Sequence, residues 1–258
     1  MIVDDEEINR EMLRYILSPH FGSFLVAADG GEALSLLAQG HQVDVILLDL
    51  EMPVLDGLQT TRQIRVIEQA QGGHIPVIAM TASELPEDIE RCHHAGMDAF
   101  VSKPFRLEDI LSAVERVMSV SPELSPSLTT VDSTDGEQRT VPSETVSEAV
   151  FNYQGLLARV GNRKDQIADY VDMFTEEIDQ DLPALERAIL AEDGEAIARL
   201  THSIRGTTCN IGAERMFSVA KELAVSVRNS EGTVLRSLLA TLQTEYRLFK
   251  SVLEKSAF

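Results

Sequence analysis

The segment that decides the fold is His41-Gln-Val-Asp-Val-Ile-Leu-Leu-Asp-Leu-Glu-Met-Pro-Val-Leu-Asp-Gly57. A largely apolar run ends at the carboxylate of Asp49, and turn residues follow at Pro53 and at Asp56-Gly57. An unbroken apolar strand bounded by turns is typical of the buried centre of a parallel sheet, whose two faces are covered by helices. Ligands of such sheets bind at the carboxyl ends of the strands. Asp49 is therefore a candidate site residue.

Short apolar segments alternate with segments of helical period on both sides of this strand. The pattern predicts a doubly wound α/β domain built on a five-stranded parallel sheet. Glycine and proline punctuate it where helices and strands should stop. Strands are expected at residues 2–3, 23–28, 43–49, 75–80 and 99–101, and each is followed by a helix.

The second half of the chain has a different character. Residues 120–150 are rich in Ser, Thr, Pro and Glu without any period, which predicts a flexible linker with a reach of about 30 Å. Beyond it the strand signals vanish, and the short polar joints favour an all-α helical bundle. Helices are expected at 156–160, 167–178, 182–190, 197–211, 217–227 and 235–253.

Charge and cysteine content restrict the function classes. Lys and Arg number 22 against 42 Asp and Glu, a formal net charge of −20. Such a balance argues against nucleic acid or an anionic membrane surface as a direct partner. The two cysteines, Cys92 and Cys209, are far apart and indicate a reducing compartment. No apolar run reaches the roughly 20 residues of a membrane helix, so we expect a cytoplasmic chain.

Polar residues gather at the carboxyl ends of the predicted strands. Asp4 and Asp5 follow the first strand, Asp49 the third and Thr81 the fourth, and Lys103 lies just beyond the fifth. Clustered carboxylates repel one another and favour a hard divalent cation such as Mg²⁺. A carboxylate in this position can attack phosphorus, while the cation, a hydroxyl and an ammonium group neutralise the transferred charge.

These residues closely resemble the receiver domain of two-component response regulators, a flavodoxin-like fold, over residues 1–119. The motifs that carry the resemblance are Val3-Asp4-Asp5, Leu48-Asp49-Leu-Glu-Met-Pro53, Met80-Thr81-Ala82 and Ser102-Lys103-Pro104. The resemblance implies that Asp49 is the phospho-acceptor. It also implies that Asp5, Asp49 and the backbone carbonyl of Glu51 bind Mg²⁺ with the help of Asp4. Glu6 stands where relatives of the hybrid-kinase type often have Asn. The first strand is short, which suggests that the chain begins inside a longer protein.

A second constellation lies on a predicted helix of the bundle. In Ala198-Arg-Leu-Thr-His202-Ser-Ile-Arg205-Gly206, the apolar residues point one way, and His202, Arg205 and Gly206 share another face. Glycine inside a helix costs about 1 kcal/mol relative to alanine. One turn from His202, Gly206 would clear the approach to the imidazole, while Arg205 offers a charge to a phosphoryl group.

This second pattern resembles the histidine phosphotransfer (HPt) domain, over residues 151–258. The resemblance implies that His202 accepts phosphoryl as a neutral imidazole, a form well populated near pH 7. Arg205 replaces the commoner lysine. A competing metal site at Cys92-His93-His94 lacks a second ligand cluster.

A receiver followed by an HPt domain is the arrangement found at the carboxyl end of hybrid sensor histidine kinases. The resemblance implies that Asp49 takes phosphoryl from an upstream kinase histidine and that His202 passes it to a separate response regulator. The chain has no glycine-rich ATP-binding motif, so it is not itself an ATP-dependent kinase. A missing upstream sensor region could tether it to the inner membrane. The alternative is a docking module that is switched by phosphorylation, in which His202 is idle.

Overall fold

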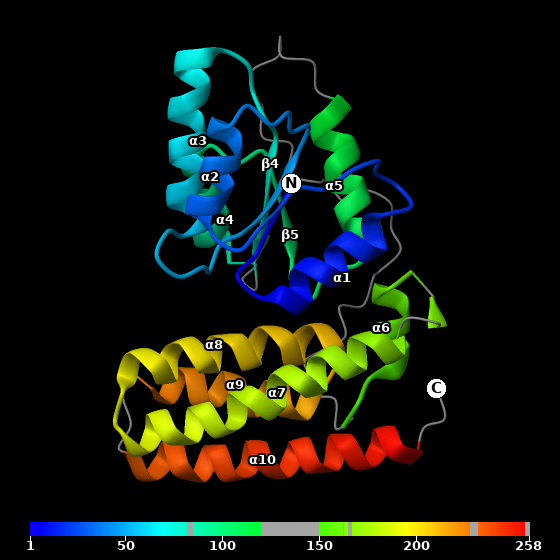
Figure 1. Cartoon of the computed structure of the whole chain (residues 1–258), viewed down its shortest axis with the longest axis vertical. Helices are drawn as coiled ribbons and strands as arrows, with labels where there is room; N and C mark the ends of the chain where they lie inside the picture. Colours follow the sequence, from blue (N-terminus) through cyan, green and yellow to red (C-terminus); the bar gives the residue numbers. More distant parts are fainter. Residues whose placement is uncertain (82–84, 120–149, 162, 165–166, 228–231, 256–258) are drawn as a thin grey trace.

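The computed structural model describes residues 1–81, 85–119, 150–161, 163–164, 167–227 and 232–255. Figure 1 shows an α/β unit lying against one side of a bundle of helices. The α/β unit is formed by the first part of the chain and the bundle by the last part. The predicted linker, residues 120–150, lies outside the described residues except for Val150.

The α/β unit is built on five parallel strands in the order β2-β1-β3-β4-β5, as predicted. Three strands begin later than the predicted residues 23, 43 and 75, namely at Val26, Ile46 and Val77. Their neighbours explain the difference, because β1 offers only two residues for pairing and Pro76, before β4, has no backbone N–H. The strands are β1 (Ile2–Val3), β2 (Val26–Ala27), β3 (Ile46–Asp49), β4 (Val77–Thr81) and β5 (Ala99–Ser102).

Helices cover both faces of this sheet, α1 and α5 on one face and α2, α3 and α4 on the other (Figure 1). Because side chains alternate along β3, Leu47 joins the core under α1 and α5, and Leu48 joins the core on the opposite face. Asp29 and Asp56 cap α2 and α3 through the backbone N–H groups of Glu32 and Gln59. The helices are α1 (Glu7–Leu17), α2 (Gly30–Ala38), α3 (Gly57–Gln71), α4 (Pro86–Ala95) and α5 (Leu107–Ser119).

The start of α3 packs tightly against the end of β3. A Cβ atom on Gly57 would collide with the backbone carbonyl of Asp49. Glycine therefore allows the loop to fold back onto the strand end, which holds the backbone around Asp49 in place.

The bundle has one helix fewer than predicted within the described residues. The expected helices at 167–178 and 182–190 form a single helix, α7, with Pro183 inside it. Ile178, Leu182 and Leu185 keep one apolar face in phase and buried across the proline. This packing outweighs the roughly 3 kcal/mol that an interior proline costs. The helices are α6 (Tyr153–Arg159), α7 (Ile167–Leu190), α8 (Gly194–Ile211), α9 (Glu214–Ser226) and α10 (Gly232–Lys255).

The two units share one hydrophobic core. Helix α1 packs on its own sheet with one side and on α7 and α8 with the other. Tyr15 and Tyr170 meet edge to face at 6.0 Å, Arg163 lies over the Tyr15 ring, and the Tyr170 hydroxyl donates to the backbone carbonyl of Met12. None of the helices in the described ranges is long and apolar enough to cross a membrane.

Candidate functional site

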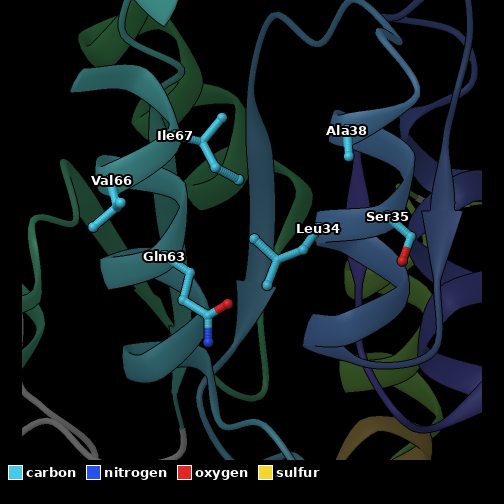
Figure 2. A pocket seen from close by; sticks show the side chains of 6 residues that line it. All are labelled: Leu34, Ser35, Ala38, Gln63, Val66 and Ile67. Atoms are coloured by element: carbon cyan, nitrogen blue, oxygen red, sulfur yellow. The ribbon is translucent and has the colours of Figure 1, made fainter. Parts of the chain in front are cut away.

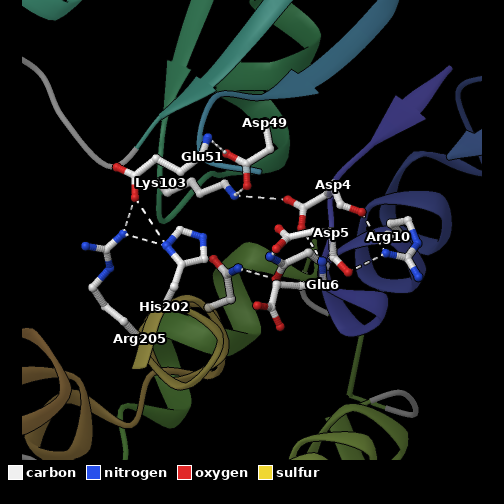
Figure 3. A network of polar contacts seen from close by, with 11 residues as sticks. Asp4, Asp5, Glu6, Arg10, Asp49, Glu51, Lys103, His202 and Arg205 are labelled. Atoms are coloured by element: carbon white, nitrogen blue, oxygen red, sulfur yellow. Dashed lines mark hydrogen bonds and ion pairs between the residues drawn. The ribbon is translucent and has the colours of Figure 1, made fainter. Parts of the chain in front are cut away.

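Asp49 ends β3 as a buried carboxylate that is 3% exposed. The Nζ atom of Lys103 lies 2.7 Å from Oδ2 of Asp49 and 3.0 Å from Oδ2 of Asp4 (Figure 3). Burial raises the pKa of Asp49 to about 6, against the opposing effect of Lys103. Burial alone would lower the pKa of Lys103, but Asp4 and Asp49 raise it well above its usual value. The lysine therefore stays charged beside Asp49.

The other strand ends complete this part of the site. Asp4 is fully buried and accepts from the backbone N–H of Glu6 and from Asn9. The Oδ1 atom of Asp5 is buried without a hydrogen-bond partner among the described residues, and burial together with Asp4 raises its pKa. Thr81 is a buried residue at the carboxyl end of β4, the neighbour of β3. The predicted residues therefore lie together at one edge of the sheet.

His202 comes from α8 of the bundle, yet it lies at the same place. Ligand atoms of Asp5, Asp49 and His202 all lie within 4.8 Å of one another. The cavity between the units is lined by Asp49, Lys103 and His202 and measures about 30 Å³. One water-sized probe needs roughly 10–15 Å³, so the space can be wet. The two predicted constellations thus form one site.

Glu51, two residues after Asp49, links the two units. Its Oε2 atom lies 2.5 Å from Nη2 of Arg205 and 3.3 Å from Nδ1 of His202 (Figure 3). The hydrogen bond from His202 lowers the pKa of Glu51 to about 2, and the same bond raises the pKa of His202. Nη2 of Arg205 also lies 3.2 Å from Nδ1. In the tautomer that pairs with the Glu51 carboxylate, which only accepts hydrogen bonds, Nδ1 carries the proton and Nε2 keeps its lone pair.

Gly206 and the residues around it bring α8 close to the start of α1. The nearest atom to a Cβ built on Gly206 is Cγ of Glu6, at 3.9 Å. Ser203 Oγ lies 3.1 Å from a carboxylate oxygen of Glu6 and donates to Asp181 at 2.8 Å. Burial and a hydrogen bond with Glu177 raise the pKa of Glu6 well above its usual value. Gly206 therefore makes room for the receiver-like unit rather than for solvent.

Sequence reasoning missed several residues of this site. Asn9 and Asn210 form a buried hydrogen bond between the units, and Ser203 meets the acidic side chains of both. A signal was present, since Asn9 interrupts the apolar stripe of α1 beside Ile8 and Met12. A polar residue on a buried helical face requires a partner.

A second, shallow groove lies between α2 and α3, on the other face of the sheet (Figure 2). It holds no titratable side chain and shares no residue with the site at Asp49. Its lining is mainly apolar and consists of Leu34, Ser35, Ala38, Gln63, Val66 and Ile67.

Comparison with known proteins identifies both units. Residues 1–115 match the family model of the response regulator receiver domain, and residues 169–251 match that of the Hpt domain. The chain contains a receiver domain and an Hpt domain. The receiver match includes Asp49 and Lys103, and the Hpt match includes His202. Both predicted domain types and the predicted fold class are confirmed.

Relatives carry the two domains within longer proteins. The sensory/regulatory protein RpfC of Xanthomonas campestris is 25% identical over 255 residues, which are 99% of this chain and 32% of RpfC. Probable histidine kinase 6 of Oryza sativa is 34% identical over 134 residues, 46% of this chain and 14% of the relative. The chain thus spans a third or less of these proteins. Its receiver and Hpt domains give it a two-component phosphorelay role.

Solved structures align with the receiver domain. CheY4 of Vibrio cholerae is 32% identical with a TM-score of 0.41, covering 45% of this chain and 94% of that one. The Mg²⁺ complex of the receiver domain of CKI1 from Arabidopsis thaliana is 28% identical with a TM-score of 0.40, covering 45% and 88%.

Proposed function

We propose that Asp49 accepts phosphoryl from an upstream histidine kinase, that His202 of the same chain takes it from Asp49, and that His202 passes it to a separate response regulator. One observation carries this proposal. Two groups that each resemble a phosphoryl acceptor, on different domains, have ligand atoms within 4.8 Å of each other. Reacting atoms about 3–3.5 Å apart are needed for attack, so a small adjustment brings phosphoryl and imidazole into line.

Within the chain, transfer exchanges one bond for another. The Nε2 lone pair of His202 attacks phosphorus, a P–N bond forms, and the bond from phosphorus to the Asp49 oxygen breaks. The electron pair of that bond returns to Asp49 as a carboxylate, beside the charged Lys103. The Nδ1 proton of His202 stays directed at Glu51 throughout, which offsets the positive charge that the ring gains.

The same site fits Mg²⁺. Asp5 and Asp49 would hold the ion with the backbone carbonyl of Glu51, and Asp4 would support them. The Oδ1 atom of Asp5, buried and without a hydrogen-bond partner among the residues that the structure describes, is the kind of hard oxygen ligand that Mg²⁺ prefers. When bound, the cation supplies positive charge to the phosphoryl oxygens. The Glu51 side chain, which points at the Hpt domain, is not needed for this role.

The partners and the domain limits belong to the same proposal. We place the receiver domain at residues 1–119, the linker at 120–150 and the Hpt domain at 151–258. The donor would be a kinase histidine, and the final acceptor would be the receiver aspartate of another protein. The match to RpfC supports this reading because it runs through both domains.

Labelling the chain tests the proposal. The chain is incubated with acetyl phosphate and Mg²⁺, and the phosphate on Asp49 and the acid-labile phosphate on His202 are followed over time. We expect label on Asp49 first and on His202 later, none on either residue in Asp49→Asn, and label only on Asp49 in His202→Gln. Label that stays on Asp49 in the parent would instead support a docking module in which His202 is idle.

A further inference from the structure

Asn9 of the receiver domain and Asn210 of the Hpt domain form a buried amide pair across the interface. Asn9 is 1% exposed and Asn210 is 3% exposed. Nδ2 of Asn210 lies 2.5 Å from Oδ1 of Asn9. Neither residue belongs to the phosphoryl-transfer motifs. Leaving such a group unpaired would cost its full desolvation penalty, so docking has to bring the two amides into register.

The pair continues a chain of polar contacts that ends at the acceptor. Nδ2 of Asn9 donates to Oδ1 of Asp4 at 3.0 Å. The other oxygen of Asp4 accepts from Nζ of Lys103, which also donates to Asp49. Four contacts therefore connect α8 of the Hpt domain to the phospho-acceptor through buried or partly buried side chains.

The chemistry of the side chains fixes which group donates in each of these hydrogen bonds. The Asp4 carboxylate accepts hydrogen bonds and does not donate them, so Asn9 must turn its Nδ2 toward Asp4. Asn9 then presents only its oxygen to the Hpt domain, which must supply a donor at this point. Asn210 supplies one through Nδ2, while its own Oδ1 has no partner within the described part of the chain.

The place of Asn210 on α8, far from His202, lets the Asn9–Asn210 pair help to orient this helix. His202 and Asn210 are eight residues apart, about 12 Å along a helix that rises 1.5 Å per residue. Arg205 holds one part of α8 to Glu51, and Asn210 holds the far end to α1. Arg159 in turn donates to the backbone carbonyl of Asn210, which ties the end of α8 to α6. Two separated contacts fix both the position and the direction of the helix that carries His202.

We propose that Asn9 and Asn210 are positioning residues of the relay: a donor on α8 and an acceptor on α1 that select a matching Hpt surface and set His202 in line with Asp49. This proposal rests on transfer between Asp49 and His202. An error of about 1 Å in the placement of reacting groups can cost 100-fold in rate, so loss of one such contact should be visible in transfer.

A double-mutant cycle on the full chain tests the proposal. Asn9→Ala, Asn210→Ala and the double variant are labelled on Asp49 with acetyl phosphate and Mg²⁺, the small donor is removed, and transfer to His202 is timed. We expect each single change to slow transfer by about tenfold, the factor that corresponds to ~1.4 kcal/mol. The double variant should be slowed by about as much as Asn9→Ala alone, which also loses the donor to Asp4, because the contact between Asn9 and Asn210 is lost only once. Asn210→Ala should label Asp49 as the parent does.

Asn152→Ala is the matched control, since Asn152 donates from Nδ2 to Glu214 and accepts from the backbone N–H of Gly155, both within the Hpt domain. It should transfer at the parental rate. Factors that multiply in the double variant, or parental rates in the single variants, would overturn the proposal.

Asn210→Asp is made as a second variant, and the melting of both Asn210 variants is measured. If Asn210→Ala unfolds, slow transfer in a folded Asn210→Asp supports the positioning role, and parental transfer overturns it. If both unfold, Asn210 holds the bundle together, and the positioning role is likewise overturned. Absence of transfer in the parent would instead defeat the proposed relay itself.

Discussion

The Glu51 carboxylate of the receiver domain lies 3.3 Å from Nδ1 of His202 in the Hpt domain. The carboxylate that contacts the His202 imidazole therefore comes from the domain that carries Asp49. The hydrogen bond made by one ring nitrogen of a histidine decides the state of the other. Here the pair forms only when the two domains meet.

Glu51→Gln should slow transfer from Asp49 to His202 by about tenfold, because the amide orients the ring less strongly and no longer pairs with Arg205. The measurement is a single-turnover time course that starts from chain already phosphorylated on Asp49. Glu87→Gln changes an exposed glutamate on α4 in the same way and serves as the control. Equal rates in the two variants would remove Glu51 from the mechanism.

Transfer to His202 should speed up as pH rises. The hydrogen bond with Glu51 raises the pKa of His202 above 6.5, so part of the ring is protonated and not nucleophilic near neutrality. The stabilisation from the protonated pair is complete below about pH 6.5 and is lost as pH rises through the raised pKa. Rates measured between about pH 5.5 and 8.5 should rise and then level off. In Glu51→Gln the midpoint should move to lower pH, and a rate that falls from pH 6 upward would contradict this assignment.

Gly206→Leu should leave the bundle folded and block transfer. Leucine is the better helix former by about 1 kcal/mol, so the melting temperature of the Hpt domain should not fall. Its side chain, however, would enter the space in front of Glu6, whose Cγ is 3.9 Å from the Cβ position. We expect transfer to fall by about 100-fold, since the domains can no longer close to reacting distance.

Gly194→Leu is the control for that variant, because Gly194 lies on the same helix and, outside its own helical turn, no atom of the described residues lies within 4 Å of its Cβ position. It should transfer normally. A Gly206→Leu chain that unfolds, or that transfers at the rate of the control, would contradict the role of Gly206 in domain approach.

Lys103→Ala should destabilise the receiver domain as well as impair its phosphorylation. Lys103 is the cation between the buried carboxylates of Asp4 and Asp49, and removing one member of a buried ion pair costs about 3–5 kcal/mol. Mg²⁺ should restore part of this loss by supplying charge at the same place. Urea unfolding with and without Mg²⁺ measures both effects, and an unchanged free energy of unfolding would refute the ion-pair argument.

Transfer from Asp49 to His202 should not depend on protein concentration in the micromolar range. A tether of moderate length gives the second domain a local concentration on the order of millimolar. Dilution of phosphorylated chain over a tenfold range tests this directly. If mixed Asp49→Asn and His202→Gln chains transferred as fast as the parent, the relay would run between molecules.

The sequence alone predicted most of the fold and the type of each domain. The strand ends at Asp49 and Thr81, and the helix with His202 and Gly206, carry patterns that depend on residues close in sequence. Pro183 predicted a break between two helices, but the structure has the single helix α7, because tertiary packing outweighed the cost of a proline inside a helix.

The interface could not be predicted in the same way. Contacts between Glu51 and Arg205, or between Asn9 and Asn210, join residues more than 150 positions apart. Their pairing depends on how the surfaces of the two domains fit together. The hydrophobic periodicity of a single helix does not indicate which residues meet across an interface. Only the polar Asn9 within an apolar stripe hinted that α1 meets a second surface.

The core that runs through α1 into both domains would limit the access of other proteins to Asp49 and His202. While α1 is covered by α7 and α8, Asp49 and His202 lie so close together that each blocks the approach of another protein to the other. An upstream kinase and a downstream response regulator would therefore have to bind at different times. Each would bind only after the two domains of the chain had separated. In the proposed relay, the closed arrangement would therefore shield the phosphoryl group from other proteins during transfer, and the group would leave His202 only after the two domains separate.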